Sequence, residues 1–247
     1  MTTKNNYIHM PSLFDDYDTS DKKPIVQAIN KRRQQLLKLT NFGISYDKII
    51  IKSGKHGFPK IKPYYGEIPS NYIDFGDVKS KGCDNCCVTG YEYDYILMNL
   101  WNSFDEYVPI LSKSLCVCNP DYSMYVDSGL ATQISNKLKS HEVAYMLQEN
   151  GIAILPSMTW SSTRSYDFCF DGFSKGGAVI VSTIGTLRYE CSRRYFKKGF
   201  FEMLKHIAPD SVILYGDTTD EIKLWMPQEL DVHYIPHYRF ERARKNG

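Results

Sequence analysis

Two aspartates follow directly after a short apolar run in LCVCNPDYSMYVDSG, residues 115–129. Asp121 and Asp127 are expected just beyond the carboxyl end of a buried strand, where parallel α/β enzymes place their chemistry. Paired carboxylates there could divide general-acid and general-base roles, or could hold Mg²⁺ through their oxygens. A structural reading stays open, because Asp and Ser after a strand commonly cap the next helix. Ser123 and Tyr125 of the same segment are predicted to bind substrate.

Two later strand ends carry further candidates. Asp217 closes the segment SVILYGD and is predicted to be catalytic together with the two aspartates above. Trp160 closes the segment IAILPSMTW. Its indole could stack on a base or a sugar, or could simply cover the end of the sheet.

A phosphate-binding corner is predicted after the segment AVIVSTIGT. Thr183 and Gly185 lie in it, and Arg188 follows closely. Loops at this position of a barrel commonly hold phosphate through backbone N–H groups. All three residues are therefore predicted to bind substrate.

The elements that must position these residues are short apolar strands alternating with helical patterns. Such an alternation predicts a parallel sheet, because a parallel connection needs a crossover. No glycine-rich dinucleotide fingerprint follows any strand, which favours a (β/α)-barrel-like fold, closed or incomplete, over an open doubly wound sheet. No helix is expected between the strands predicted at 72–75 and 86–90. The other predicted strands are 115–119, 152–160, 178–186, 211–217 and 232–235, and the helical patterns are 93–113, 131–151 and 192–210.

The chain has 247 residues, of which 43% are hydrophobic, so it can bury a substantial core. An acidic lead and a basic helical extension are predicted over residues 1–59, with the α/β domain over 60–247. No run is long and apolar enough for a membrane span, and the first residues lack the apolar core of a signal peptide. A cytoplasmic location is therefore expected.

Charge is concentrated in one segment. Residues 22–62 hold eleven Lys or Arg and a single acid, Asp47, although the whole chain has a net charge of only +2. Such a segment could be a solvated face, or it could contact nucleic acid or an acidic protein. The residues predicted to bind nucleic acid are Lys31, Arg32, Arg33, Lys52, Lys55, Lys60 and Lys62.

Seven scattered cysteines suggest reduced thiols rather than a disulfide framework. Cys83 and Cys86, together with Cys116 and Cys118, have the ligand types of a Cys₄ zinc site. Cys116 and Cys118 sit in a predicted core strand, however, and the adjacent Cys87 would be left over. Buried apolar thiols are favoured, and no metal ligand is assigned.

Several blocks of the sequence resemble, in the same order, an uncharacterised domain family carried by bacterial phages, plasmids and integrated mobile elements. The resemblance covers roughly residues 60–220. It implies an origin in a mobile genetic element and a cytosolic location in a bacterial host cell, and it implies no reaction. The blocks are KPYYGEIP (62–69), WNSFDEYVPIL (101–111), NPDYSMY (119–125), ILPSMTW (154–160), YDFCFDGFSKGG (166–177), VSTIGT (181–186) and VILYGD (212–217).

The stretch VDSG, residues 126–129, also resembles a strand-end motif of tRNA-guanine transglycosylases, whose aspartate handles the base. The second glycine and the aromatic of that motif are replaced by Leu130 and Ala131, and the zinc ligands of that family are not recognisable. Base chemistry is one alternative that this resemblance implies.

We therefore expect a phage or mobile-element protein with a barrel-like enzyme domain that acts on a nucleotide or nucleic acid through strand-end carboxylates. The alternatives are a non-catalytic nucleic-acid-binding protein and an anti-defence protein that acts by contact with a host protein.

Overall fold

The computed structural model describes residues 54–237. The chain divides into one unit of residues 1–43 and another of residues 44–247, and the described residues all belong to the second. The strands are β1 (Tyr72–Asp74), β2 (Cys87–Thr89), β3 (Cys116–Cys118), β4 (Ile154–Leu155), β5 (Ala178–Ser182), β6 (Ser211–Tyr215) and β7 (Asp231–Ile235). The helices are η1 (Phe75–Asp77), α3 (Val78–Lys81), α4 (Asp94–Asn102), α5 (Phe104–Leu111), α6 (Leu130–Glu149), η2 (Thr163–Ser165), α7 (Glu190–Ile207) and α8 (Asp220–Trp225).

All seven strands pair in parallel and in chain order. One sheet has the order β1-β2-β3-β4 and the other β5-β6-β7, and a parallel bridge between Ser157 and Ile180 joins the two. The α/β class with parallel strands is therefore confirmed. No closed barrel is found, because no ladder joins β7 to β1 within residues 54–237.

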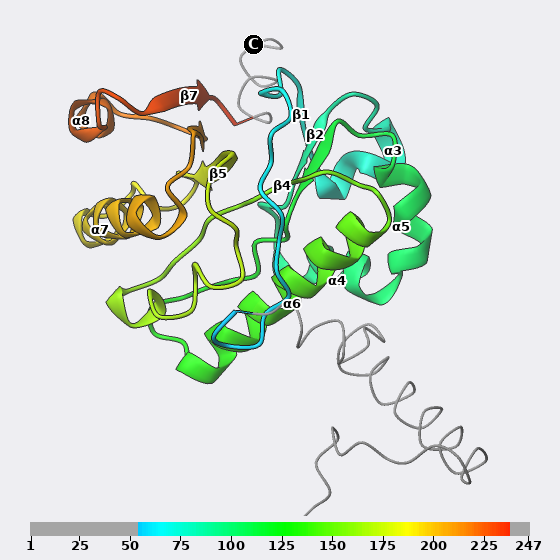
Figure 1. Ribbon diagram of the computed structural model, residues 1–247, viewed down its shortest axis with the longest axis horizontal. Coiled ribbons are helices and arrows are strands. Elements are labelled where there is room, and N and C mark those ends of the chain that lie inside the picture. Colours follow the sequence, from blue (N-terminus) through cyan, green and yellow to red (C-terminus); the bar gives the residue numbers. More distant parts are fainter. Residues whose placement is uncertain (1–53, 238–247) are drawn as a thin grey trace, which may run out of the picture. The chain divides into compact units, whose positions relative to one another are not determined.

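The helices flank the strands on several sides (Figure 1). In that view α3, α4 and α5 lie on the right, α7 and α8 lie on the left, and α6 runs below the strands. Side chains alternate along β5 and β6, so Val181 and Leu214 pack in the cluster that contains the α7 side chains. Ile180 and Ile213 turn the other way and pack with Leu155 of the first sheet. The two sheets thus share one inner core.

Three local predictions are corrected. The link between β1 and β2 contains η1 and α3, because Phe75 and Val78 bury their side chains and fold the crossover into helical turns. The helical pattern 93–113 forms two helices, because Ser103 leaves the helical region with φ −129° and ψ 41°. The crossover from β4 to β5 contains η2 and turns but no α-helix, and its DGFSKGG stretch is glycine-rich.

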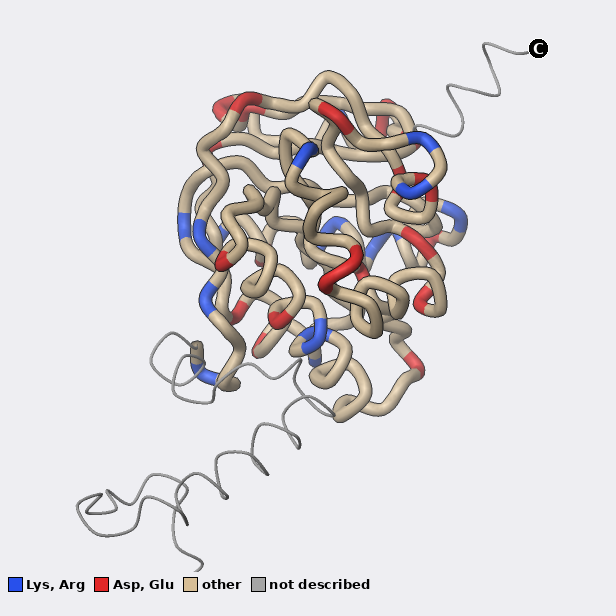
Figure 2. Tube along the Cα trace, turned by 90° about the vertical axis from the view of Figure 1, so that its right-hand side faces the viewer, with Lys and Arg blue, Asp and Glu red and all other residues tan. Residues whose placement is uncertain are grey.

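The described body carries both signs of charge. Figure 2 shows Lys and Arg interspersed with Asp and Glu, with neither sign confined to one side. Among residues 54–237, no helix has the length and apolar character that crossing a membrane requires.

Candidate functional site

A pocket of about 250 Å³ lies at the carboxyl ends of β4 and β5. Its walls come from the segments that follow β3, β4 and β5 and from the start of α7. Aromatic and hydroxyl side chains dominate these walls, and none of the lining residues is charged. We call this the carboxyl-end pocket; its lining is Met124, Tyr125, Val126, Met158, Thr159, Trp160, Ser161, Val181, Ser182, Gly185, Thr186, Ser192, Tyr195 and Phe196.

Buried polar side chains of α6 hold the segments that form the pocket. The Gln133 amide donates to the backbone oxygens of Tyr125 and Ser128, at 3.0 Å each, and accepts from the Ser161 hydroxyl at 2.6 Å. Asn136 donates to the backbone oxygen of Ser123 at 2.8 Å. Buried polar groups need such partners, and these bonds fix the loops after β3 and β4 against one helix.

A second anchor is Asn119, which follows β3. Its amide donates to the Ser140 hydroxyl of α6 at 2.9 Å and to the Ser157 backbone oxygen at 3.2 Å. The Ser157 N–H donates back to the Asn119 side-chain oxygen at 2.6 Å. The chain beyond β4 is thereby held in place where it enters the pocket wall.

Two ionisable groups meet beside the pocket-lining Thr159. Burial raises the pKa of Asp121 to about 6, and the Lys137 ammonium and the Thr159 hydroxyl act against that rise. Burial lowers the pKa of Lys137, whose Nζ lies 3.4 Å from the Thr159 hydroxyl and 5.1 Å from the centre of the Phe173 ring. The raised pKa of Asp121 and the lowered pKa of Lys137 both favour the uncharged form of the group. Such pKa shifts are typical of acid–base groups in active sites.

Trp160 forms part of the pocket wall and packs against α7. Its Nε1 donates to the Tyr195 backbone oxygen at 3.2 Å, and its ring lies 5.7 Å from that of Phe196. Gly199 permits this approach, since a Cβ there would lie 2.1 Å from Nε1. The glycine that weakens the helical pattern of the sequence therefore has a packing reason.

The structure brings three of the predicted substrate-binding residues together: Tyr125, Trp160 and Gly185 line the same pocket. The other three lie outside its lining. They are Ser123, which donates to Asp94 through its N–H and its hydroxyl, Thr183, which donates to the backbone oxygen of Asp217, and Arg188, which lies over the ring of Tyr189.

The three predicted catalytic carboxylates differ in their exposure to solvent. Asp121 is partly buried, whereas Asp127 and Asp217 are exposed, and none of them lines the carboxyl-end pocket. Within the described part of the chain, no three His, Cys, Asp or Glu side chains are grouped as metal ligands.

Three of the seven cysteines occupy the inner core. The Cys87 and Cys118 sulfurs lie 3.7 Å apart, and Cys116 belongs to the same buried cluster. Cys83 instead donates to the backbone oxygen of Ile110 at 3.2 Å. The cysteine set considered for zinc is thus divided between two places.

Of the predicted nucleic-acid-binding residues, Lys31, Arg32, Arg33 and Lys52 lie outside the described residues. Lys55, Lys60 and Lys62 are exposed. Lys62 borders a hollow together with Leu115, which immediately precedes β3, and Ile152, which lies shortly before β4. These lysines therefore do not join the carboxyl-end pocket.

A polar cluster at the inner carboxyl ends escaped the sequence analysis. The Thr89 hydroxyl donates to Asp74 at 2.8 Å, and His237 Nε2 lies 3.9 Å from the same carboxylate. Tyr215 packs between the rings of His237 and Tyr91, at 5.5 and 5.6 Å. In the sequence, the polar residues that end the short strands YID and CVT were the signal for this cluster. The pairing of Asp74 with a histidine more than 160 residues later could not be predicted, because it depends on the fold.

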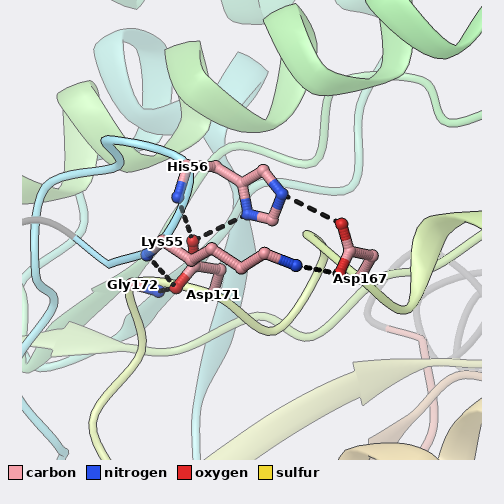
Figure 3. A network of polar contacts seen from close by, with 5 residues as sticks. All are labelled: Lys55, His56, Asp167, Asp171 and Gly172. Carbon is pink, nitrogen blue, oxygen red and sulfur yellow. Dashed lines mark hydrogen bonds and ion pairs between the residues drawn. The ribbon is translucent and has the colours of Figure 1, made fainter.

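A second network joins the start of the described body to the loop before β5 (Figure 3). His56 Nδ1 lies 2.9 Å from Asp171, and its Nε2 lies 3.1 Å from Asp167, which also pairs with the Lys55 ammonium. Asp171 accepts the backbone N–H groups of Lys55, His56 and Gly172. We call these five residues the His56 clasp. It secures residues 54–58, including the buried Phe58, to the body.

Two relatives come from phages. The "Gene 1 protein" of Mycobacterium phage D29 is 28% identical over 123 residues, which are 50% of this chain and 46% of that protein. The "Gene 1 protein" of Mycobacterium phage L5 is 26% identical over 152 residues, which are 62% of this chain and 65% of that protein. The chain thus spans less than two thirds of the length of either relative. No solved structure matches significantly.

These relatives confirm the resemblance to an uncharacterised family that phages carry. The matching region also contains the pocket, the α6 side chains that hold it and the His56 clasp. Residues 51–233 match the family described as a domain of unknown function (DUF4417), and the chain belongs to this family.

Proposed function

We propose that this phage-family protein is an enzyme that binds the base of a nucleotide or nucleic acid in the carboxyl-end pocket and uses Asp121 for proton transfer. The observation that carries the proposal is the juxtaposition of an uncharged, aromatic and hydroxyl-lined pocket with a pair of groups whose pKa values are shifted. Thr159 links the two, because it lines the pocket and contacts Lys137.

The size and chemistry of the pocket suit a base. Its volume of about 250 Å³ is slightly below the range of about 300–1,000 Å³ for drug-sized ligands. Tyr125 and Tyr195 offer ring faces, and Ser161, Ser182 and Thr186 offer hydroxyls as donors and acceptors. A flat, uncharged ring with polar edges would use both kinds of group.

Asp121 is suited to exchange a proton. With a pKa of about 6, it is protonated in slightly acidic solution and ionised above neutrality. General catalysis works best when the pKa of the acid lies near the working pH. Lys137 opposes the rise in that pKa, so it would hold the ionised form of Asp121 in place.

The barrel-like arrangement supports this location. The strands follow chain order without reversal, and His237 after β7 lies 3.9 Å from Asp74 at the end of β1. We infer an incomplete barrel. Barrel enzymes bind their substrates at the carboxyl ends of the strands, where the pocket lies.

A second candidate function rests on charge. Eleven Lys or Arg against one acid in residues 22–62 favour a nucleic-acid-binding protein in which the body is a scaffold. In that case the basic segment, rather than the pocket, would govern affinity.

Binding of nucleosides and nucleoside monophosphates by calorimetry tests the proposal on the full chain. Tyr125→Ala should weaken binding about tenfold, because it removes a ring face from the pocket. Tyr65→Ala is the matched control, since Tyr65 is equally exposed but borders the hollow next to Leu115 and Ile152. Its affinity should equal that of the wild type.

The pH profile tests the role of Asp121. Binding should weaken as the pH rises through about 6, because ionised Asp121 adds a negative charge behind the pocket-lining Thr159. Asp121→Asn should flatten that profile. An identical pH profile for the wild type and Asp121→Asn would show that Asp121 has no role in binding. If no nucleoside or nucleotide binds, or if Tyr125→Ala leaves the affinity unchanged, the pocket is not the binding site.

A further inference from the structure

We propose that the ligand is single-stranded nucleic acid, which crosses the loops at the carboxyl ends of β2, β3 and β5 and places one base in the carboxyl-end pocket. This inference rests on the proposed function and extends it from one base to a strand.

Exposed aromatic side chains gather at these loops. Tyr93 and Tyr95 follow β2, Tyr125 follows β3 and Tyr189 follows β5, and each is 57–71% exposed. The Tyr93 and Tyr95 rings are stacked, with centres 5.6 Å apart and planes 11° apart. Exposed aromatic faces on a soluble body favour a partner that stacks on them, and unpaired bases do so regardless of sequence.

Contacts link the segments that carry the four tyrosines to one another and to the carboxyl-end pocket. Asp94, between Tyr93 and Tyr95, accepts the N–H and the hydroxyl of Ser123, both at 3.0 Å, which ties the first loop to the segment of Tyr125. Tyr125 and Gly185 both line the pocket. Tyr189 follows Gly185 by four residues, so the proposed path of the strand runs from α4 past the pocket to the start of α7.

Cations lie at the α7 end of this surface. A hollow of about 400 Å³ shares Phe196 with the pocket and is lined by Arg193, Arg194 and Lys197. Two carboxylates, Glu190 and Glu221, also line it and leave one net positive charge. Arg188 adds another cation, 5.4 Å from the ring centre of Tyr189.

The arrangement fits a strand better than a duplex or a protein partner. A base that enters the pocket or stacks on a tyrosine must have an accessible ring face. In a duplex, stacking between neighbouring base pairs covers these faces. The cations beyond Tyr189 match the phosphates that link such bases. Exposed rings at several loops with cations beside the last of them also differ from the continuous apolar centre of a protein interface.

Fluorescence anisotropy with labelled oligonucleotides of about 16 nucleotides tests the proposal, with DNA and RNA single strands and a DNA duplex as separate arms. Single strands should bind more tightly than the duplex and than a mononucleotide. Tyr93→Ala combined with Tyr95→Ala should weaken strand binding by about 5- to 100-fold, the loss expected for one stacked base. Tyr65→Ala should bind like the wild type.

Salt dependence tests the cations. Replacing Arg188, Arg193 and Arg194 by Gln should reduce the slope of log K against log salt by about 2, since each phosphate contact of a single strand contributes about 0.7. Melting temperatures of the variants establish that they are folded.

The outcomes separate the two proposals. Suppose that Tyr125→Ala weakens mononucleotide binding but that oligonucleotides bind no more tightly than mononucleotides. This result overturns the proposal of a bound strand and leaves the proposal of a base-binding pocket standing. Strand binding that survives the tyrosine and arginine changes, but is lost on charge reversal at Lys31, Arg32 and Arg33, also overturns the proposal of a bound strand, because the basic segment would then be the binding site.

Discussion

Lys137, His141 and Glu142 of α6 are ionisable groups whose side chains are almost wholly buried. Burial disfavours the charged form in each case. It lowers the pKa of Lys137, lowers that of His141 to about 3, with Lys137 adding to the effect, and raises that of Glu142 to about 8. His141 Nδ1 lies 2.9 Å from the backbone oxygen of Lys137, so the neutral ring donates there. Around these residues, desolvation outweighs charge pairing.

Glu142 makes the stability of the protein depend on pH. Its folded-state pKa lies above its ordinary value of 4.5, so its contribution is complete below pH 4.5 and is lost as the pH rises through about 8. Glu142→Gln keeps the shape without the charge. It should therefore exceed the wild type in free energy of unfolding at pH 9 by an amount on the order of a few kcal/mol.

Urea unfolding between pH 4 and pH 9 measures this difference. Glu229→Gln is the control, since Glu229 is exposed in the turn before β7. A constant difference between Glu142→Gln and the wild type over the whole pH range would contradict the assignment.

At the scale of the element, α6 and α7 differ from what their sequence patterns alone indicate. The pattern of residues 131–151 predicts an amphipathic helix, yet α6 buries Gln133, Lys137 and Ser140 toward the loops. These side chains are satisfied by the segments after β3 and β4, so α6 is a polar scaffold for the pocket. In α7, position 199 holds glycine and not a better helix former, and this allows the Trp160 ring to approach the helix.

Gly199→Ala tests the packing of α7. Helix propensity alone would stabilise the protein by about 1 kcal/mol. The Cβ would instead lie 2.1 Å from Trp160 Nε1, so we expect a net loss of stability on the order of 1–3 kcal/mol.

The double variant Gly199→Ala with Trp160→Ala separates the two effects. Alanine at 199 should become neutral or stabilising once the indole is gone, as measured by thermal unfolding. If Gly199→Ala is as stable as the wild type, Trp160 does not require the glycine.

At the scale of the whole molecule, the His56 clasp joins segments about 115 residues apart. Asp171 accepts four N–H groups from residues 55, 56 and 172. Burial alone would raise its pKa, but these bonds outweigh that effect and lower the pKa. Its contribution is therefore present above its ordinary pKa and is lost in acid, as the pH falls through the lowered value.

Removing that acceptor should loosen the attachment of residues 54–58. Asp171→Ala leaves the N–H groups without their partner and should lower the free energy of unfolding by about 2 kcal/mol. Asp167→Ala is the matched control, because its exposed carboxylate contacts the same histidine and should matter little. Equal midpoints of denaturant unfolding for the two variants would show that Asp171 has no special role.

Local pattern alone predicted the parallel α/β class and the strand-end location of polar and aromatic residues. Periodicity reports which residues are apolar, and parallel strands place all their carboxyl ends on one edge. Tyr125, Trp160 and Gly185 follow three different strands and line one pocket for that reason.

The tertiary structure decided which strand-end residues line the pocket and which polar side chains of α6 are buried. It also decided the meeting of Asp74 with His237 and the His56 clasp. Each depends on loop conformations and on contacts between segments far apart in the chain. Local sequence fixes which residues follow a strand. Only the packing of helices and crossovers around the sheet fixes which of those side chains face one another and which lose their contact with water.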